Sequence, residues 1–473
     1  MKRWFMRTLL VLIAAAGSSM FSPRLSAPTQ GGSTQEPMPQ LPVLSFPYSA
    51  ATASSFTSVK LYNPVTEAAP AFASDAAAAD GALAKHEPLS GAYLGMLGAD
   101  KRVGFQFERI ESVYGRKHAI YLTYVGWRKL QTDTNTYFPK RVADRVKALG
   151  GALQIGWEPR YGLNDVQDDE YVRRFAREAK ESGIPIFLRY ASEMNGPWVP
   201  WHGDPKLFIE KFRLIHRIMA EEAPNVAMVW APNSVPAANI DEYYPGDDAV
   251  DWVGFSLYTG PTTFEDKLDL DSSLLDTFAP LYAKYSKKPI MISEGAVVHT
   301  LLPDNTSYTE WAVGQLDELY AYLPRLFPQV KAFTYFNNAR ARSERANSKY
   351  VYDLGENAAM DAAYQQHIQS PLFLSQVRQG MAAPGAVRYE PLEAGSGLPA
   401  GRHELLAYTR LKDGAMPHAF ALYRSDGQLL DVSYERPWRL QVDISADEAL
   451  RPVYAVAFDN TLAPMAVQEI SAK

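Results

Sequence analysis

Short apolar runs recur along the middle of the chain and alternate with longer amphipathic stretches. Eight such runs fall within residues 91–378, and each is near-continuously apolar, as is typical of strands buried on both faces. They occupy residues 92–98, 119–127, 152–159, 184–193, 226–233, 250–258, 288–294 and 330–338. This βα alternation predicts an α/β fold, a (β/α)8 TIM barrel over residues 91–378.

Most of the intervening stretches carry apolar residues at helical spacing. Asp169 and Asp204 open two of them and Gly183 ends one, and all three are favourable helix caps. A doubly wound open sheet is the alternative architecture. A Gly-rich phosphate loop after the first strand would favour that sheet, and GMLGAD at residues 95–100 is not such a loop.

The two ends of the chain have a different pattern from the barrel. After about Gly380 the helical spacing stops, and strand-like runs with an Asp426-Gly427 hairpin turn predict a small β-sandwich over residues 385–473. Residues 23–90 are rich in Ala, Ser, Thr and Pro, which is typical of a linker or N-terminal extension. Within this extension, residues 44–62 could hold one or two strands packed on a neighbour.

The first 22 residues have the pattern of a secretory signal peptide. Lys2, Arg3 and Arg7 flank the apolar run Thr8–Ala16, and small residues follow it. The run is too short to span a bilayer comfortably, although an uncleaved anchor is the alternative. We therefore expect a secreted or periplasmic protein with no stable membrane span after cleavage.

Composition narrows the function classes. The chain has 473 residues, 47% of them hydrophobic, a net charge of −6 and no cysteine. The acidic balance argues against a nucleic-acid partner, and the missing cysteines exclude thiolate metal sites and a Cys nucleophile. Metal-ligand spacing and a GxSxG serine context are also lacking. No metal and no cofactor are therefore expected, and the protein is expected to be a monomer.

Candidate chemistry collects where the predicted strands end, because barrel active sites lie at the C-terminal ends of the strands. Alternation places Phe187, Arg189, Ala191 and Glu193 on one face of their strand. Ile290, Ile292 and Glu294 would share a face in the same way. Other polar and aromatic residues at these ends, which we predict to support the site or bind substrate, are Trp127, Trp157, Glu158, Asn195, Trp198, Trp201, Trp230, Tyr258 and Asn337.

Two carboxylates across an aromatic-lined mouth suit glycoside hydrolysis, in which one protonates the leaving oxygen and the other attacks the anomeric carbon. Arg189 and Tyr258 are candidate donors to the carboxylate that must stay ionised. Each residue alone has a simpler explanation, since strand-end Glu residues are commonly solvated and Trp residues commonly belong to the core. The joint placement of Glu193, Glu294 and the tryptophans favours an enzyme.

The segment LRYASEMNGPWVPW, residues 188–201, resembles the acid/base motif of glycoside hydrolase family 26. The segments GWEP, WAPN, YYPGDDAVDWVGFSLY and KPIMISEGA are similar to other strand segments of that family, in the same order. The resemblance covers about residues 91–338. It implies Glu193 as acid/base, Glu294 as nucleophile, Tyr258 as hydrogen-bond donor to the nucleophile, and Trp198 and Trp201 as subsite residues.

The same resemblance implies a retaining, endo-type β-glycanase. Family members cleave β-mannan, β-1,3-xylan or mixed-linkage β-glucan. Two departures weaken the case for mannan: Ser192 stands where many mannanases of the family have His, and the eighth strand ends in Phe336-Asn337-Asn338.

The C-terminal segment is similar to bacterial immunoglobulin-like modules. We therefore expect a secreted retaining β-glycoside hydrolase acting on a β-linked polysaccharide or oligosaccharide. A noncatalytic polysaccharide-binding or exopolysaccharide-assembly protein is the alternative. A further one is an enzyme that trims a polysaccharide made by its own cell.

Overall fold

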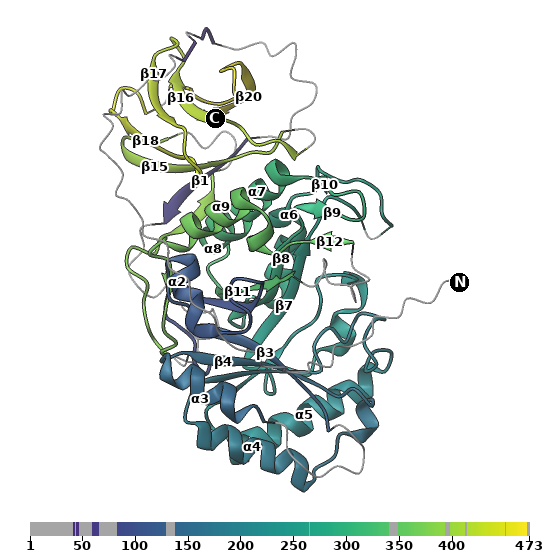
Figure 1. The fold of residues 1–473 in the computed structure, drawn as a ribbon. Helices are drawn as coiled ribbons and strands as arrows, with labels where there is room; N and C mark the ends of the chain where they lie inside the picture. Colours follow the sequence, from purple (N-terminus) through teal and green to yellow (C-terminus); the bar gives the residue numbers. More distant parts are fainter. Residues whose placement is uncertain are drawn as a thin grey trace, which may run out of the picture.

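The protein is described here by a computed structural model, in which a helix-surrounded barrel carries a smaller β domain at one end (Figure 1). The residues that the structure describes are 41–42, 44–46, 59–65, 83–128, 138–263, 265–339, 349–392, 398–411, 414–449 and 451–470. The predicted signal peptide, residues 1–22, and most of the predicted extension 23–90 lie outside them.

The predicted barrel is confirmed as a closed ring of eight parallel strands. Neighbouring strands pair in chain order from the first to the eighth, and the eighth, β11, pairs back with the first, β2. All eight apolar runs became these strands, with small differences at their ends. The strands are β2 (Ala92–Ala99), β3 (Ile120–Gly126), β4 (Ala152–Glu158), β5 (Ile186–Tyr190), β6 (Val226–Trp230), β7 (Trp252–Thr259), β8 (Ile290–Val297) and β11 (Val330–Asn338).

Helices cover the outside of the ring, and their caps follow the sequence signals. The Asp169 side chain accepts a hydrogen bond from the Val172 amide at the start of α4, and Gly183 ends that helix at φ 68°. Asp204 caps α5 in the same way. The helices are α2 (Ile110–Tyr114), α3 (Lys140–Ala148), α4 (Glu170–Ser182), α5 (Pro205–Glu222), α6 (Leu274–Tyr285), α7 (Thr309–Asp317), α8 (Leu323–Leu326) and α9 (Ala358–Ile368).

Two connections depart from regular βα units. Between β6 and β7 the chain forms only the short 3-10 turns Ala237–Asn239 and Asp241–Tyr243. Between β8 and β11, a π-helical segment, Glu318–Tyr322, joins α7 to α8. Two short strands, β9 (Thr300–Leu301) and β10 (Thr306–Ser307), precede α7. They form a small sheet with β12 (Tyr350–Val351), which follows β11 in the chain.

Side chains alternate between two apolar layers along the barrel strands. An inner cluster, which includes Tyr93, Phe187, Trp252 and Met291, fills the ring near the N-terminal ends of the strands. The much larger outer cluster lies between the strands and the helices. A strand residue therefore points either into the ring or toward the helices, and only the inner row can reach the barrel mouth.

Segments on both sides of the predicted 91–378 unit close the N-terminal end of the ring. Lys85 Nζ donates to the carbonyl of Val226 at 2.6 Å, and the indole of Trp252 donates to the Lys85 carbonyl at 2.8 Å. The strand β13 (Phe373–Leu374) pairs with β2, and Ala383 joins the inner cluster. The described barrel unit thus runs slightly beyond the predicted limits.

Two four-stranded antiparallel sheets form the C-terminal domain, which agrees with the predicted sandwich; its immunoglobulin-like character stays a prediction. Strand β1 (Lys60–Val65), from the predicted extension, lies between β14 and β15 in one sheet. The extension therefore contributes a strand to the distant C-terminal domain. The remaining strands are β14 (Arg388–Pro391), β15 (Gly401–Tyr408), β16 (Ala419–Arg424), β17 (Leu429–Ser433), β18 (Arg439–Ile444), β19 (Val453–Phe458) and β20 (Pro464–Ile470).

A buried carboxylate joins the sandwich to the barrel. Glu318, at the start of the π segment, is fully buried and accepts hydrogen bonds from Tyr408 at 2.8 Å and from Ser273 at 2.9 Å. Arg410 from the sandwich lies 3.4 Å from the same carboxylate. The Tyr322 hydroxyl, one turn further on, donates to the Ala407 carbonyl at 3.0 Å. The two domains therefore share a polar contact that has been removed from water.

The interface predicts a measurable cost for removing its cation. Arg410→Met leaves Glu318 buried without a compensating charge, which typically costs about 3–5 kcal/mol. We expect a clearly lower thermal midpoint, measured by circular dichroism, and partial recovery in the Arg410→Met/Glu318→Gln double variant. Arg402→Met, on the exposed part of β15, is the control and should leave the midpoint nearly unchanged. Equal midpoints for Arg410→Met and the control would contradict a stabilising role for the buried pair.

Candidate active site

Glu294 reaches the inside of the barrel because β8 contains a bulge. Phe255 of β7 is paired with Ile292, but the next residue, Ser256, is paired with Glu294, so Ser293 is an extra residue. Ile290 and Ile292 belong to the outer layer and Met291 to the inner one. The predicted single face for Ile290, Ile292 and Glu294 is therefore wrong, because the bulge turns Glu294 inward.

The bulge is held from across the ring by Gln154 of β4. The Gln154 side-chain amide donates to the Ser293 carbonyl at 2.7 Å, and its oxygen accepts from the Thr334 hydroxyl at 2.8 Å. All three groups are buried, so these hydrogen bonds fix the backbone immediately before Glu294.

Three donors hold the Glu294 carboxylate. Arg189 Nη1 lies 2.6 Å from one oxygen, which also accepts a hydrogen bond from the Tyr124 hydroxyl. The Tyr258 hydroxyl donates to the other oxygen at 2.7 Å, as predicted. Arg189 is fully buried and Glu294 is 6% exposed. A guanidinium and two hydroxyls therefore surround this carboxylate with donors.

Glu193 lies on a tight turn beyond the end of its strand. Strand β5 stops at Tyr190, and Ala191 and Glu193 have φ values of 48° and 60°. The Glu193 amide donates to the Ala231 carbonyl at 2.8 Å, which ties the turn to the end of β6. The predicted alternating row ending at Glu193 is thus wrong beyond Arg189. Left-handed backbone at two non-glycine residues is strained, and such strain is common where a side chain must be aimed.

The donors to the Glu193 carboxylate among the described residues are neutral. The Trp198 indole donates to one oxygen at 2.6 Å, and the Asn233 side-chain amide donates to the other at 3.0 Å. Burial raises the pKa of Glu193, and the negative charge of Glu294 raises it further, against weaker lowering effects of Ser256, Trp198 and Arg189. The environment therefore favours a protonated Glu193 beside an ionised Glu294.

Asn195 and Trp201 support this turn. Asn195 donates to the carbonyls of Asn233 and Pro236 at 2.9 and 3.0 Å and accepts from the Asn233 amide at 2.9 Å. The Trp201 indole donates to the Ser192 carbonyl at 2.8 Å, and its ring is 5% exposed. Asn195 thus orients Asn233, as a supporting residue should, whereas Trp201 braces the turn and does not offer a face to a sugar as predicted.

Four residues predicted to bind substrate lie elsewhere. Trp157 stacks on Phe175 of α4 with ring centroids 3.9 Å apart, and Trp127 stacks on Trp157. Trp230 packs against Tyr285 of α6. These tryptophans belong to the outer layer because their strand positions point toward the helices. The fourth, Asn337, is fully buried and bonds to Tyr114 and the Leu354 amide.

The row that faces inward is Tyr124, Gly156 and Arg189, which are direct neighbours in the register of β3, β4 and β5. A side chain at Gly156 would come within 2.7 Å of the Tyr124 ring, so the glycine makes room for that ring to cross toward Glu294. Sequence reasoning missed Tyr124, Gln154 and the role of Asn233. Alternation along β4 separates Gln154 from Trp157, but the face that each takes, and that of Tyr124, follows from the register with β5.

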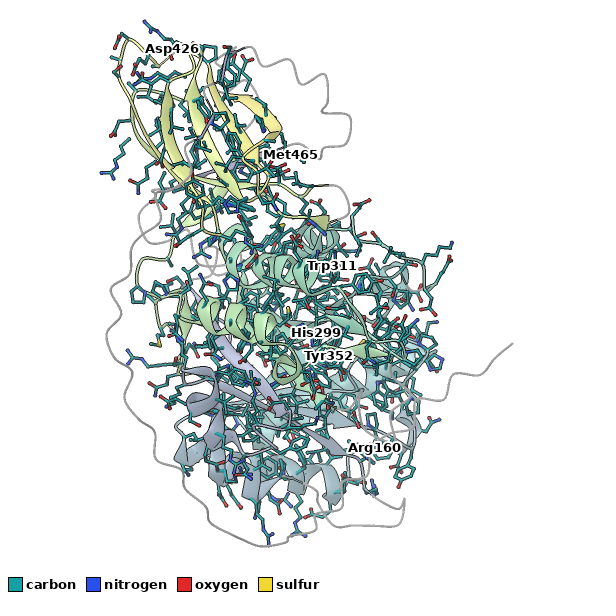
Figure 2. All side chains as sticks on the ribbon, turned by 45° about the horizontal axis from the view of Figure 1, so that its top comes forward. Arg160, His299, Trp311, Tyr352, Asp426 and Met465 are labelled. Carbon is teal, nitrogen blue, oxygen red and sulfur yellow. The ribbon has the colours of Figure 1, made fainter. Side chains whose placement is uncertain are left out.

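Aromatic rings form an apolar wall beside Glu294. The centroid of the Tyr258 ring lies 5.8 Å from that of Phe336 and 6.1 Å from that of Tyr352. The centroids of Phe336 and Tyr124 are 6.3 Å apart. Figure 2 labels Tyr352 in the part of the barrel nearer the sandwich and Arg160 in the part farther from it. Phe336 lies near the end of the eighth barrel strand, whose sequence differs from the family pattern, and it places an aromatic ring at the mouth.

Glu158, which is predicted to bind substrate, ends β4, and its carboxylate pairs with the Arg160 guanidinium at 2.7 Å.

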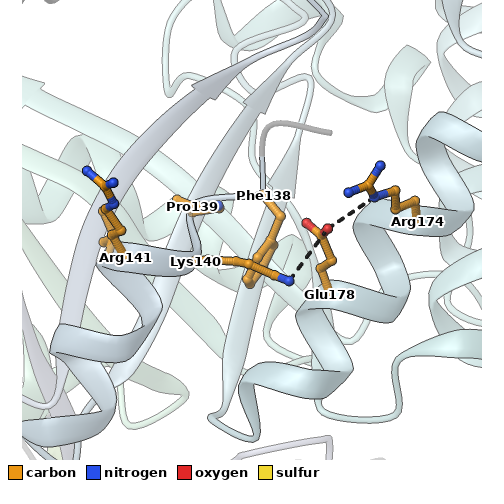
Figure 3. Close-up of a pocket in the computed structure, with 7 residues that line it drawn as sticks. Phe138, Pro139, Lys140, Arg141, Arg174 and Glu178 are labelled. Atoms are coloured by element: carbon orange, nitrogen blue, oxygen red, sulfur yellow. Dashed lines mark hydrogen bonds and ion pairs between the residues drawn. The ribbon is translucent and has the colours of Figure 1, made fainter. Parts of the chain in front are cut away.

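A separate hollow of about 460 Å³ lies outside the ring, between α3 and α4 (Figure 3). Its lining includes Phe138, Lys140 and Glu178, and the Glu178 carboxylate lies 3.7 Å from Lys140 and 3.2 Å from Arg174. The Glu178 carboxylate is thus shared by two cations on the outer surface, away from Glu193 and Glu294.

The described residues contain neither a metal-binding cluster nor a membrane-spanning helix. Within the described ranges, no three His, Asp or Glu side chains are grouped so that they could bind a metal ion. None of the helices described is both long and apolar enough to cross a bilayer.

Comparison with known proteins gives one family-model match and several similar glycan-cleaving enzymes. The model of glycosyl hydrolase family 26 matches residues 164–280, which include Glu193 and Tyr258 and end before Glu294. Endoglucanase H of Acetivibrio thermocellus is 28% identical over 255 residues, which are 50% of this chain and 27% of that protein. A β-1,3-xylanase of a Vibrio species is 30% identical over 171 residues, 34% of this chain and 35% of that protein.

The chain therefore spans only about a third or less of the length of these curated relatives. Among solved structures, a modular endo-β-1,4-mannanase from Cellulomonas fimi aligns with a TM-score of 0.40 and 15% identity, over 81% of this chain and 94% of that chain. The sequence matches agree with the resemblance carried by residues 188–201, and residues 164–280 are similar to glycosyl hydrolase family 26.

Proposed function

We propose that the barrel is a retaining β-glycoside hydrolase that cleaves a β-linked polysaccharide by double displacement. Glu193 would be the acid/base and Glu294 the nucleophile. One observation carries the proposal: two neighbouring carboxylates have opposite environments, since Glu294 is held by a guanidinium and two hydroxyls, whereas burial raises the pKa of Glu193. Acid and nucleophile need this division of protonation states.

In the first step, Glu193 gives its proton to the glycosidic oxygen while a Glu294 oxygen bonds to the anomeric carbon. The bond between that carbon and the leaving oxygen breaks, and a glycosyl ester forms on Glu294. In the second step, Glu193, now ionised, takes a proton from water as the water oxygen attacks the anomeric carbon and releases Glu294. Arg189, Tyr124 and Tyr258 would balance the charge on Glu294 as it is consumed and restored.

The substrate class is proposed from the relatives and from one residue beside Glu193. The two curated relatives are an endoglucanase and a β-1,3-xylanase, and Ser192 replaces the His of many mannanases. We therefore favour a β-glucan or β-xylan over β-mannan. Secretion or periplasmic location is proposed from the N-terminal pattern of residues 1–22 alone.

Removing either carboxylate should abolish hydrolysis. We expect Glu193→Gln and Glu294→Gln each to lower turnover of a cleavable β-glucan, β-xylan or β-mannan by at least about 10²–10⁴-fold. New reducing ends are measured for both variants. Glu178→Gln, a partly shielded glutamate on α4, is the matched control and should retain activity. A wild-type protein that retains glycan on affinity gels without new reducing ends would favour the noncatalytic alternative.

The two glutamates should respond differently to the leaving group. Glu193→Gln removes proton donation, which a nitrophenolate leaving group does not need. An aryl glycoside should therefore still release a rapid first burst of nitrophenol, followed by slow turnover. Glu294→Gln should release no burst. Stopped-flow absorbance checks this, and identical behaviour of the two variants would exclude the assigned roles.

The pH profile should report the raised pKa of Glu193. The Trp198 indole stabilises ionised Glu193, so Trp198→Phe should raise this pKa further. The acid form then persists to higher pH, and the alkaline limb of kcat/KM should move upward by about 0.5–1 pH unit. Trp311→Phe, whose indole bonds to Leu270 far from the mouth, is the control. A downward shift would contradict the proposed proton donor.

A further inference from the structure

Two charged side chains at the end of β4 face the barrel mouth and have no part in the two-glutamate chemistry. Glu158 lies opposite Gly126 in the β3–β4 register, on the same face as Gly156, which is opposite Arg189. Alternation therefore directs Glu158 into the mouth, one step above the row that contacts Glu294. Its side chain is 16% exposed, so it is accessible from the mouth.

Arg160 holds this carboxylate in place. Its Nε and Nη2 donate to one Glu158 oxygen at 2.9 and 2.7 Å. The guanidinium fills the space that a side chain at position 126 would take, since an added Cβ on Gly126 would lie 2.7 Å from Cζ and Nη1. Gly126 thus makes room for a guanidinium directly over the end of β3. Arg160 is 30% exposed and lies on the part of the barrel away from the sandwich (Figure 2).

A partly exposed ion pair contributes little to stability, typically about 0–1 kcal/mol, so folding alone does not explain this arrangement. Both hydrogen bonds use the same Glu158 oxygen, and Nη1 is turned toward Gly126. The pair therefore still offers a carboxylate acceptor and guanidinium donors. Tyr161, the next residue of the same turn, adds a ring that is 45% exposed.

We propose that Glu158 and Arg160 form a subsite that binds hydroxyl groups of a neutral sugar unit beside the cleavage point. This inference rests on the proposed glycoside hydrolase function. The Glu158 carboxylate accepts from one sugar hydroxyl, and Arg160 donates to a neighbouring sugar oxygen. Charge favours a neutral sugar, because Glu158 and Glu294 would repel a uronic acid carboxylate and Arg160 is already paired.

The first measurement is hydrolysis by Arg160→Met and Glu158→Gln. On the β-glycan that the wild type cleaves best, we expect kcat/KM to fall about 10–100-fold in each variant, as for the loss of a charged hydrogen bond. The alkaline limb set by Glu193 should stay within a few tenths of a unit. Arg160→Lys should recover part of the loss.

A bidentate ion pair outside the mouth provides matched controls. Arg213 of α5 contacts Asp248 at 2.8 and 2.6 Å, with similar chemistry on the outer surface. Arg213→Met and Asp248→Asn should therefore leave kcat/KM unchanged. Thermal midpoints of all variants identify any loss that comes from misfolding.

Binding is measured separately in the Glu294→Gln background by titration with oligosaccharides of the same glycan. Arg160→Met should weaken binding about 10-fold or more, while Arg213→Met should not. Wild-type-like kcat/KM and binding in both mouth variants would overturn the subsite but leave the glycoside hydrolase proposal intact. A wild type that cleaves none of β-mannan, β-xylan and β-glucan would instead count against the proposed function. Stronger cleavage of a uronic-acid glycan than of neutral ones would overturn the neutral-sugar assignment.

Discussion

The upper half of the barrel is organised around one buried carboxylate. Glu294 is 6% exposed, and Arg189, Tyr124 and Tyr258 approach its carboxylate from β5, β3 and β7. Each donor depends on the register of its own strand. The bulge at Ser293, held by Gln154, brings the carboxylate to the point where these donors meet. Loss of Glu294 would therefore leave the buried Arg189 without its counter-charge.

The Glu193 carboxyl group has the opposite kind of environment. It lies on a strained turn, with neutral donors from Trp198 and Asn233, and its pKa is raised by burial and by Glu294. Asn195 and Trp201 hold that turn through backbone carbonyls and are not themselves aimed at the mouth. The string of aromatic and polar residues after β5 thus has two roles, which are orienting the Glu193 carboxyl group and bracing the loop that carries it.

The helical segment that follows β8 connects the barrel mouth to the C-terminal sandwich. The strand carries Glu294, and the following α7 and π segment carry Glu318, which is bonded to Tyr408 of the sandwich. Strand β1, from before the barrel, completes a sheet of that sandwich. The segments before and after the barrel are therefore folded together, and the C-terminal domain contacts the barrel through the buried Glu318 carboxylate.

The sequence by itself determined the eight strands, the helix caps, the sandwich and both glutamates, because burial periodicity and capping are local properties of the chain. It also identified Arg189 and Tyr258, whose strand-end positions are visible in the pattern. Only the tertiary structure decided which face each strand-end residue occupies. A bulge at Ser293 and a left-handed turn at Glu193 each break the two-residue period of their own segment. The pairing of β3 and β4 with β5 places Tyr124 and Gln154 on the inner face, and Trp127, Trp157 and Trp230 lie in the helix layer. Register between strands is a property of the closed ring, and no single strand encodes it.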